Sequence, residues 1–208
     1  MSPEFKLLSA FLQNPSKELY GRQIERLTGT NHERTVVYLN KLVTSHRALI
    51  GERKGKQVFY RLNKQNEIAQ KALSVAELER KIGFIRKNKD GFVIQDLVSG
   101  ITGEFGPAVY FIILFGSAAR GQAREESDID LLFVLLQNGK TKSRIEEFVK
   151  KRSIIGGKRF SFHSVTLPEL KRRWSKEPVY KNIWDERIVF FGGENFWNFV
   201  LKEGEPHG

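Results

Sequence analysis

The chain has 208 residues, with 35 lysines and arginines against 24 aspartates and glutamates, which gives a formal net charge of +11. Hydrophobic residues make up 40% of it, enough to build packed cores, and the length suits one large domain or two small ones. Cysteine is absent, which excludes a disulfide scaffold, a thiolate zinc site and a cysteine nucleophile. No apolar run approaches the roughly 20 residues of a membrane span, and residues 1–10 lack the pattern of a signal peptide, so we expect a cytoplasmic protein without a membrane partner.

The positive charge is concentrated near the N-terminus. Residues 1–66 contain 12 lysines and arginines against 5 aspartates and glutamates, a net charge of +7, whereas residues 67–208 contain 23 against 19, a net charge of +4. A small basic segment is typical of a module that binds nucleic acid, although a solvated surface that merely keeps a protein soluble has a similar composition.

The N-terminal third contains three predicted helices. Apolar residues recur at helical spacing over residues 5–12, and the pattern ends before Pro15. A short second helix is predicted over residues 21–27, ended by Thr28 and Gly29. Asn31 is a good N-cap for a third helix, whose predicted apolar positions are Val36, Val37, Leu39, Leu42 and Val43.

A predicted β-hairpin follows, with strands at residues 48–50 and 58–62 around a basic tip at residues 51–57. This order of elements resembles a winged helix-turn-helix domain, which we place at residues 1–66. In that family the third helix enters the major groove of DNA and the hairpin, or wing, touches the backbone or the minor groove. The resemblance implies nucleic-acid contacts, DNA in the first place, from residues of the third helix and the wing: Asn31, His32, Arg34, Thr35, Tyr38, Lys41, Arg53, Lys54 and Lys56.

The alternative for these residues is a solvated face on a dimerisation or protein-docking module. We favour nucleic-acid binding because the wing is basic and because we expect the face of the third helix to lack large exposed apolar groups.

Residues 66–88 continue the helical periodicity and predict a connector at residues 67–88 before a second domain at residues 89–208. Such a helix could pair with its copy in a homodimer, since winged-helix proteins often bind palindromes as dimers. Its apolar positions are Ile68, Ala72, Leu73, Val75, Leu78, Ile82 and Ile85.

The second domain opens on a continuous apolar run at residues 109–115, which predicts a strand buried on both faces. The run ends at Gly116 and Ser117. We expect a short helix and a turn over residues 118–123, a polar loop at residues 125–127 and a second strand at residues 128–135. Side chains two apart on a strand share a face, so Asp128 and Asp130 should present their carboxylates together.

Paired carboxylates repel each other unless a cation lies between them, and a set of oxygen ligands suits Mg²⁺ or Mn²⁺ bound to substrate phosphates. Gly116 and Ser117 supply what a phosphate needs, because glycine permits close approach of the backbone and the serine hydroxyl is a hydrogen-bond donor. Together these residues predict a site for a metal-bound triphosphate, which is typical of phosphoryl and nucleotidyl transfer.

The two motifs, Gly116-Ser117-Ala118-Ala119-Arg120-Gly121 and Ser127-Asp128-Ile129-Asp130-Leu131, resemble the G-S-x-x-R-G and S-D-I-D-L signature of the nucleotidyltransferase superfamily. That superfamily includes DNA polymerase β and the minimal nucleotidyltransferases. The resemblance covers roughly residues 90–200 and implies an α/β (α+β) fold with a mixed sheet backed by helices. It implies that Gly116 and Ser117 bind the triphosphate of an NTP and that Asp128 and Asp130 are catalytic metal ligands. Arg120 would either face the nucleotide or brace the loop through a salt bridge to Glu125 or Glu126.

The chain departs from the family pattern at one point. Active members usually carry a third carboxylate on the next strand, predicted here at residues 158–165, yet this segment has no aspartate or glutamate. Ser161 best matches the missing position, and His163 is a neighbour that could act as a base or a ligand.

Three functions remain open from the sequence. One is a metal-dependent nucleotidyltransferase that transfers an NMP from an NTP to an unknown hydroxyl acceptor and carries a DNA-binding winged-helix module. The alternative is a transcriptional regulator whose nucleotidyltransferase-like domain binds a nucleotide without turnover. The third is a member of a two-gene toxin–antitoxin pair that modifies its partner protein.

Overall fold

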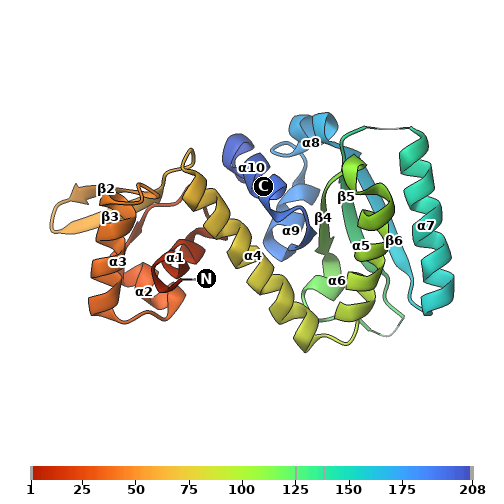
Figure 1. The fold of residues 1–208 in the computed structure, drawn as a ribbon, viewed down its shortest axis with the longest axis horizontal. Coiled ribbons are helices and arrows are strands. Elements are labelled where there is room, and N and C mark those ends of the chain that lie inside the picture. The colour runs from red at the N-terminus through yellow and green to blue at the C-terminus, as the bar shows by residue number, and fades with distance from the viewer. Residues whose placement is uncertain (1, 125, 138, 207–208) are drawn as a thin grey trace. The chain divides into compact units, whose positions relative to one another are not determined.

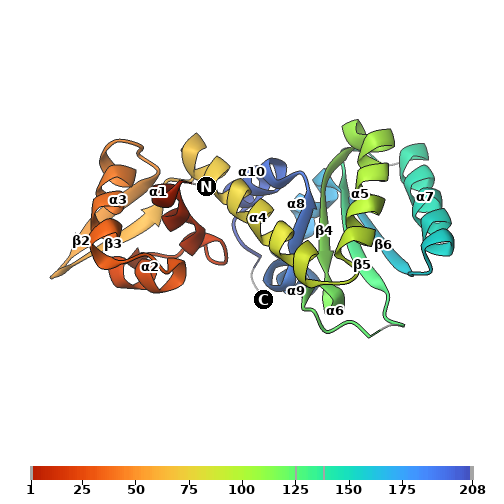
Figure 2. The same ribbon diagram turned by 60° about the horizontal axis from the view of Figure 1, so that its bottom comes forward.

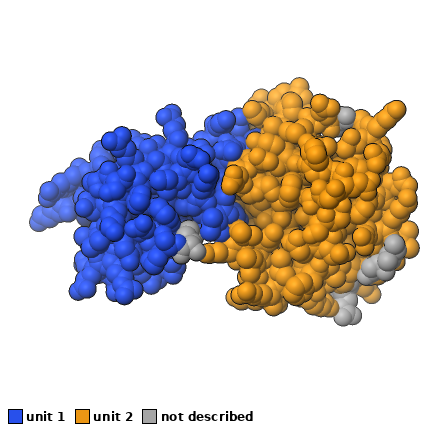
Figure 3. Space-filling view, in the orientation of Figure 1, with its two compact units in different colours: residues 1–77, 197–205 blue, residues 78–196, 206–208 orange. Residues whose placement is uncertain are grey.

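The structure of the chain is a computed structural model that describes residues 2–124, 126–137 and 139–206 (Figure 1). It is a mixed α/β structure with two separate sheets, as expected. The chain divides into two compact units, Met1–Glu77 with Trp197–Glu205 and Leu78–Phe196 with Pro206–Gly208 (Figure 3). Within the described residues, no helix combines the length and the apolar character that crossing a membrane requires.

The first unit packs short helices against a small antiparallel sheet of strand order β1-β3-β2. The predicted first helix is divided between an α-helical turn and a 3-10 segment, and its side chains Leu7, Leu8 and Phe11 are fully buried. The elements are α1 (Pro3–Lys6), η1 (Leu7–Phe11), β1 (Leu19–Tyr20), α2 (Gly21–Thr28), α3 (His32–Thr44), β2 (Leu49–Lys54) and β3 (Gln57–Leu62).

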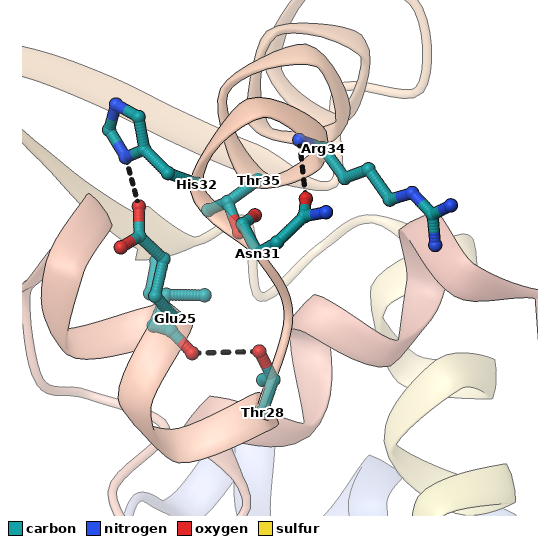
Figure 4. A network of polar contacts seen from close by, with 7 residues as sticks. Glu25, Thr28, Asn31, His32, Arg34 and Thr35 are labelled. Carbon is teal, nitrogen blue, oxygen red and sulfur yellow. Dashed lines mark hydrogen bonds and ion pairs between the residues drawn. The ribbon is translucent and has the colours of Figure 1, made fainter.

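The junction between α2 and α3 is fixed by caps at both helix ends (Figure 4). Gly29 ends α2 in the left-handed conformation, with φ of 65°. Asn31 is the N-cap of α3, as predicted, and its side-chain oxygen accepts a hydrogen bond of 3.0 Å from the backbone N–H of Arg34. The ring Nδ1 of His32 lies 2.6 Å from a carboxylate oxygen of Glu25 and ties the two helices together.

Helix α3 corrects two expectations. Leu39 and Leu42 are buried, but Val36 and Val37 are 54% and 53% exposed, so the expectation of a helix face without exposed apolar groups was wrong. The helical period explains this, because two adjacent residues beside a buried stripe point away from it. Thr35 is fully buried and donates a hydrogen bond to the carbonyl of Asn31, so it cannot contact nucleic acid.

The hairpin is longer than predicted. Strand β2 runs to Lys54 and β3 starts at Gln57, so the expected tip at residues 51–57 was wrong, and only Gly55 and Lys56 turn the chain. Gly55 has φ of 63°, a conformation that favours glycine. Arg53 and Lys54 therefore lie in a strand.

Helix α4 (Glu67–Lys87) forms where the connector was predicted. Its apolar residues divide into two sets. Ala72 and Leu73 are buried, whereas an exposed stripe consists of Ile68, Val75, Leu78 and Ile82.

The second unit is built on a four-stranded sheet of order β6-β5-β4-β7, in which β5 and β6 are parallel and the other pairs are antiparallel. The predicted strand at residues 109–115 is confirmed. The elements are α5 (Gly91–Phe105), η2 (Gly106–Ala108), β4 (Val109–Phe115), α6 (Gly116–Ala119), β5 (Ile129–Leu135), α7 (Lys140–Gly156), β6 (Phe160–Thr166), α8 (Leu167–Arg173), α9 (Pro178–Glu186), β7 (Ile188–Phe191) and α10 (Gly193–Glu203). The short helix α6 begins at Gly116, two residues before the predicted start.

The two faces of this sheet have different coverings (Figures 1 and 2). On one face, Ile129, Leu131 and Phe133 of β5 join the main core with residues of α5 and α7. Because side chains alternate along a strand, Asp130 and Leu132 lie on the other face, toward α9. The candidate site therefore lies on the second face, at the start of β5.

The turn after β7 fixes the edge of the sheet. Gly192 has φ of 70°, and a β-carbon at this position would collide with the backbone of Tyr110 and Phe111. Asn195 of α10 then donates a side-chain hydrogen bond of 2.8 Å to the carbonyl of Tyr110. Phe190, Phe196 and Trp197 are buried, so these aromatic residues belong to the core.

Candidate active site

Gly116 and Asp130 meet at the ends of two paired strands. Phe115 pairs in register with Asp130, so Gly116 directly follows the residue opposite the aspartate. Gly116 has φ of 74°, and a β-carbon there would collide with Oδ2 of Asp130. The backbone conformation favours glycine, and a side chain at this position would also force the Asp130 carboxylate to move.

The backbone N–H of Gly116 donates a hydrogen bond of 3.0 Å to Oε2 of Glu186, the last residue of α9. The other carboxylate oxygen of Glu186 forms an ion pair with the guanidinium group of Arg120, which also donates from Nε to Oε1 of Gln122 at 3.1 Å. Arg120 therefore braces the loop through Glu186. The sequence suggested a salt bridge from Arg120 to Glu125 or Glu126. Among the described residues Arg120 pairs with Glu186 and not with Glu126, and Glu125 lies outside the described residues.

The sequence analysis missed Glu186. It lies 70 positions from Gly116 along the chain, at the end of a helix that no local motif connects to the glycine loop. Its carboxylate accepts a hydrogen bond from the N–H of Gly116, a residue that the resemblance assigns to triphosphate binding. The hydroxyl of Ser117, in contrast, has no hydrogen-bond partner among the described residues and is left for another ligand.

The two aspartates have different partners. Oδ1 of Asp128 lies 2.9 Å from Nε of Arg159, and Oδ1 of Asp130 lies 3.6 Å from Nε2 of His163. Their side chains are 49% and 30% exposed, so both carboxylates remain accessible. No group of three potential metal ligands occurs within the described ranges. Two accessible carboxylates fit a divalent cation whose remaining ligands are substrate phosphates and water, and they do not form a closed protein site.

Ser161 is the residue that the sequence analysis matched to the position of a third carboxylate. It pairs in register with Asp130 across the parallel strands β5 and β6. Its hydroxyl lies 2.8 Å from Nε2 of His163, so the two residues share a face as predicted. The ring of His163 packs against Phe115, with 5.4 Å between the ring centres. His163 thus connects Ser161, Asp130 and the end of β4.

A cavity of about 500 Å³ opens beside His163 and Phe115. It extends along β6 between α7 on one side and α8 and α9 on the other. Its lining residues are Phe115, Leu132, Lys142, Glu146, Phe162, His163, Ser164, Val165, Arg173, Val179, Tyr180 and Ile183.

Glu169 has a structural role in this region, as part of a helix cap. Its carboxylate accepts hydrogen bonds from the backbone N–H of Thr166 at 2.9 Å and from the hydroxyl of Thr166 at 2.7 Å. These bonds hold the pKa of Glu169 below its usual value. The two residues form a capping box at the start of α8.

In the first unit, the residues predicted to bind nucleic acid differ in their exposure and in whether a carboxylate already neutralises their charge. Arg34, Lys41, Arg53 and Lys56 are exposed, and Tyr38 is half-buried. Lys54 is bound to Glu18 at 2.5 Å, and this bond raises the pKa of the lysine. Neither Arg53 nor Lys56 has a carboxylate partner in the part of the chain that the structure describes. Together with Arg61 of β3, which is also exposed, these two side chains carry the unneutralised positive charge of the hairpin.

Residues 103–184 match a family model described as Polymerase beta, Nucleotidyltransferase. The matched segment contains β4, the glycine loop, both aspartates and β6, and it ends within α9, before Glu186. A search of the curated proteins found no match to the chain. The family match supports the nucleotidyltransferase superfamily for this segment and suggests nucleotidyl transfer in general.

Proposed function

We propose that the protein is a metal-dependent nucleotidyltransferase that transfers an NMP from an NTP to a hydroxyl acceptor. The observation that carries this proposal is the contact between Gly116 and Asp130, because it brings the glycine loop of the signature against one of its carboxylates. The family match over residues 103–184 supports the same reaction class.

In the proposed reaction, the oxygen of the acceptor hydroxyl attacks the α-phosphorus of the NTP and forms a new P–O bond. The bond between the α-phosphorus and the bridging oxygen breaks, and pyrophosphate leaves with the electron pair. The hydroxyl proton passes to a base on β6, for which His163 is our candidate. Asp128 and Asp130 would hold Mg²⁺ or Mn²⁺, which neutralises charge on the phosphates and polarises them.

The phosphates would bind to the N–H of Gly116, the hydroxyl of Ser117 and the guanidinium group of Arg120. Glu186 now occupies two of these three donors with its carboxylate. Since a carboxylate and a phosphate repel each other, binding of the NTP requires Glu186 to give up these hydrogen bonds. In this proposal Glu186 competes with the substrate until the triphosphate arrives.

We also infer that residues 1–66 form a winged-helix module that binds DNA. The order of three helical segments followed by a hairpin supports it, as do the exposed side chains of Arg34, Lys41, Arg53 and Lys56. The exposed Val36 and Val37 beside Lys41 are compatible with major-groove contacts, because apolar side chains pack against thymine methyl groups.

A homodimer through α4 completes the proposal. Ile68, Val75, Leu78 and Ile82 are exposed and follow one another at spacings of a coiled-coil seam. Sedimentation of the wild type and of a Leu78→Lys variant tests this directly: we expect a dimer that the substitution converts to a monomer, and a monomeric wild type contradicts it.

The catalytic proposal is tested by measuring pyrophosphate release from ATP, GTP, CTP and UTP with Mg²⁺ and a cell extract as the source of acceptor. We expect release with at least one NTP and its loss in Asp128→Ala. The regulator alternative predicts an NTP-dependent change of DNA affinity in a gel-shift assay, with no pyrophosphate released. That pair of results would replace the enzyme with a nucleotide sensor.

A further inference from the structure

The cavity beside His163 adjoins the phosphate-binding loop and extends away from it. The loop lies at the end of β4, whereas most of the cavity follows β6, the edge strand on the other side of β5, and its lining reaches back to Phe115, the residue before Gly116. Asp130 pairs with Phe115 on β4 and with Ser161 on β6. In a nucleotidyl transfer the attacking hydroxyl and the leaving pyrophosphate lie on opposite sides of the α-phosphorus. The part of the cavity along β6 is therefore placed for the acceptor and not for the phosphates.

The lining of the cavity is about half apolar and half polar. Phe115, Leu132, Phe162, Val165 and Ile183 supply aromatic and aliphatic surface. A cavity of about 500 Å³ is within the usual range for a small molecule. These features suit a molecule with an apolar or aromatic ring body.

Tyr180 is a buried polar group that the protein leaves unused. The residue is 3% exposed and lines the cavity, and its ring packs against Trp174 at 5.7 Å between centres. Its hydroxyl has no hydrogen-bond partner among the described residues. The hydroxyl is not among the fully enclosed polar atoms that lack a partner, so it is reached from the cavity and is available to a ligand. Burial also raises the pKa of Tyr180, so the group stays a neutral donor.

The charges around the cavity leave one uncompensated cation. Arg173 is bound by both carboxylate oxygens of Glu177, at 2.6 and 2.8 Å. Glu146 pairs with Lys150 at 3.1 Å. Lys142 is half-buried and has no carboxylate partner within the described ranges. The cavity therefore offers a net positive charge, which favours an anionic ligand.

The positions of Lys142 and His163 set the orientation of that ligand. Helix α7 follows the end of β5 and leads back to the start of β6, beside which it runs (Figure 1). Its first turn, with Lys142, therefore lies toward the far ends of these strands, while Asp130 and Ser161 stand at their beginnings.

We infer that this cavity is the acceptor site and that the acceptor is a small hydroxylated molecule with an apolar ring body and an anionic group. The anionic group binds to Lys142, the ring packs against the apolar walls with a polar substituent at Tyr180, and the hydroxyl lies at the His163 end. The assignment of the ligand as the acceptor rests on the proposed function. Binding of such a ligand in the cavity does not require that any transfer occurs.

The test measures binding alone, without NTP or metal, by isothermal titration calorimetry on the full chain. The probes are para-hydroxyphenylacetate and its uncharged counterpart para-hydroxyphenylacetamide. We expect the acid to bind about tenfold more tightly than the amide, as one additional charge-assisted contact implies. In Lys142→Met this preference should disappear, while Lys151→Met, the same change of charge on the same helix, should retain it. Equal affinity of acid and amide, or an unchanged preference in Lys142→Met, would overturn the anionic specificity.

A second variant tests the location. Val179 lines the cavity and is 47% exposed, so Val179→Trp should fill the space without disturbing the core. We expect it to weaken both probes at least about tenfold while its melting temperature stays that of the wild type. Undiminished binding in this variant, or no binding of either probe to the wild type, overturns the site. Because pyrophosphate release is measured separately, failure of the acceptor site and failure of the proposed function remain distinguishable.

Discussion

Gly116 lies so close to Asp130 that a β-carbon at this glycine would collide with the carboxylate oxygen Oδ2 and would displace it. The same glycine adopts a positive φ of 74°. The positive φ and the close approach of the carboxylate occur together where β4 ends opposite the start of β5. This relationship joins the two halves of the signature, which the sequence separates by a loop.

Replacement of Gly116 by alanine should therefore damage the site more than the fold. We expect Gly116→Ala to cost about 1–3 kcal/mol through backbone strain and to abolish NTP binding, because the loop and the Asp130 side chain must both move. The matched control is Gly103→Ala in α5, where a β-carbon meets open space. That substitution should stabilise the protein by about 0.5–1 kcal/mol and leave NTP binding intact. Thermal unfolding and equilibrium dialysis with a labelled NTP measure both effects, and NTP binding retained in Gly116→Ala would contradict the role of this contact.

Glu186→Gln tests the competition between the carboxylate and the phosphates. Removal of the negative charge keeps a hydrogen-bond acceptor but eliminates repulsion, so we expect NTP to bind roughly fivefold to tenfold more tightly. The loss of the partly exposed ion pair with Arg120 should lower stability by less than about 1 kcal/mol. Asp185→Asn removes the same charge one residue away, where it pairs with Lys181, and should change neither quantity. Weaker NTP binding in Glu186→Gln would mean that the carboxylate serves only to hold the loop.

Ser161→Asp restores a third carboxylate at the position paired with Asp130. If the two aspartates bind the metal, a third oxygen ligand on this face should lower the Mg²⁺ concentration needed for half-maximal pyrophosphate release by about tenfold. Ser161→Asn has nearly the same shape without the charge and should give no such gain. An unchanged or higher Mg²⁺ requirement in Ser161→Asp would argue against a metal at Asp130.

The DNA-binding proposal distinguishes between neighbouring cations of the hairpin. Arg53→Gln and Lys56→Gln should each weaken binding and reduce the slope of log affinity against log salt by about 1, as expected for the loss of one phosphate contact. Lys54→Gln should have a smaller effect, because Glu18 already neutralises this lysine. Fluorescence anisotropy with a duplex at several salt concentrations gives the slopes. Identical slopes for the wild type and for all three variants would leave the exposed charge of the hairpin without a role in binding nucleic acid.

Local patterns predicted the strands of the second unit well. The apolar run at residues 109–115 and the alternation at residues 161 and 163 each concern residues that are neighbours along the chain, and β4 and the Ser161–His163 contact agree with them. Gly116 could likewise be assigned to the site, since its conformational freedom and its neighbour Ser117 are visible in the sequence itself.

What escaped prediction depends on distant contacts. Glu186 reaches Gly116 only because α9 folds onto the sheet, and Tyr180 lines the cavity only through the packing of the same helix. The division of α3 into the buried Leu39 and the exposed Val36 and Val37 depends on which side of the helix meets the core. The periodicity of apolar residues predicts which side of a helix is buried, but it does not predict how wide the buried face is.

The most direct test of the central claim is the transfer of label from an α-labelled NTP, in the presence of Mg²⁺, to the acceptors of a cell extract. The wild-type protein should incorporate label, and Asp130→Asn should reduce incorporation at least about a hundredfold. Asp96→Asn, which removes a charge from an exposed position of α5, should retain the full rate. Equal incorporation by Asp130→Asn and the wild type would contradict the assignment of this site as the centre of a nucleotidyltransferase.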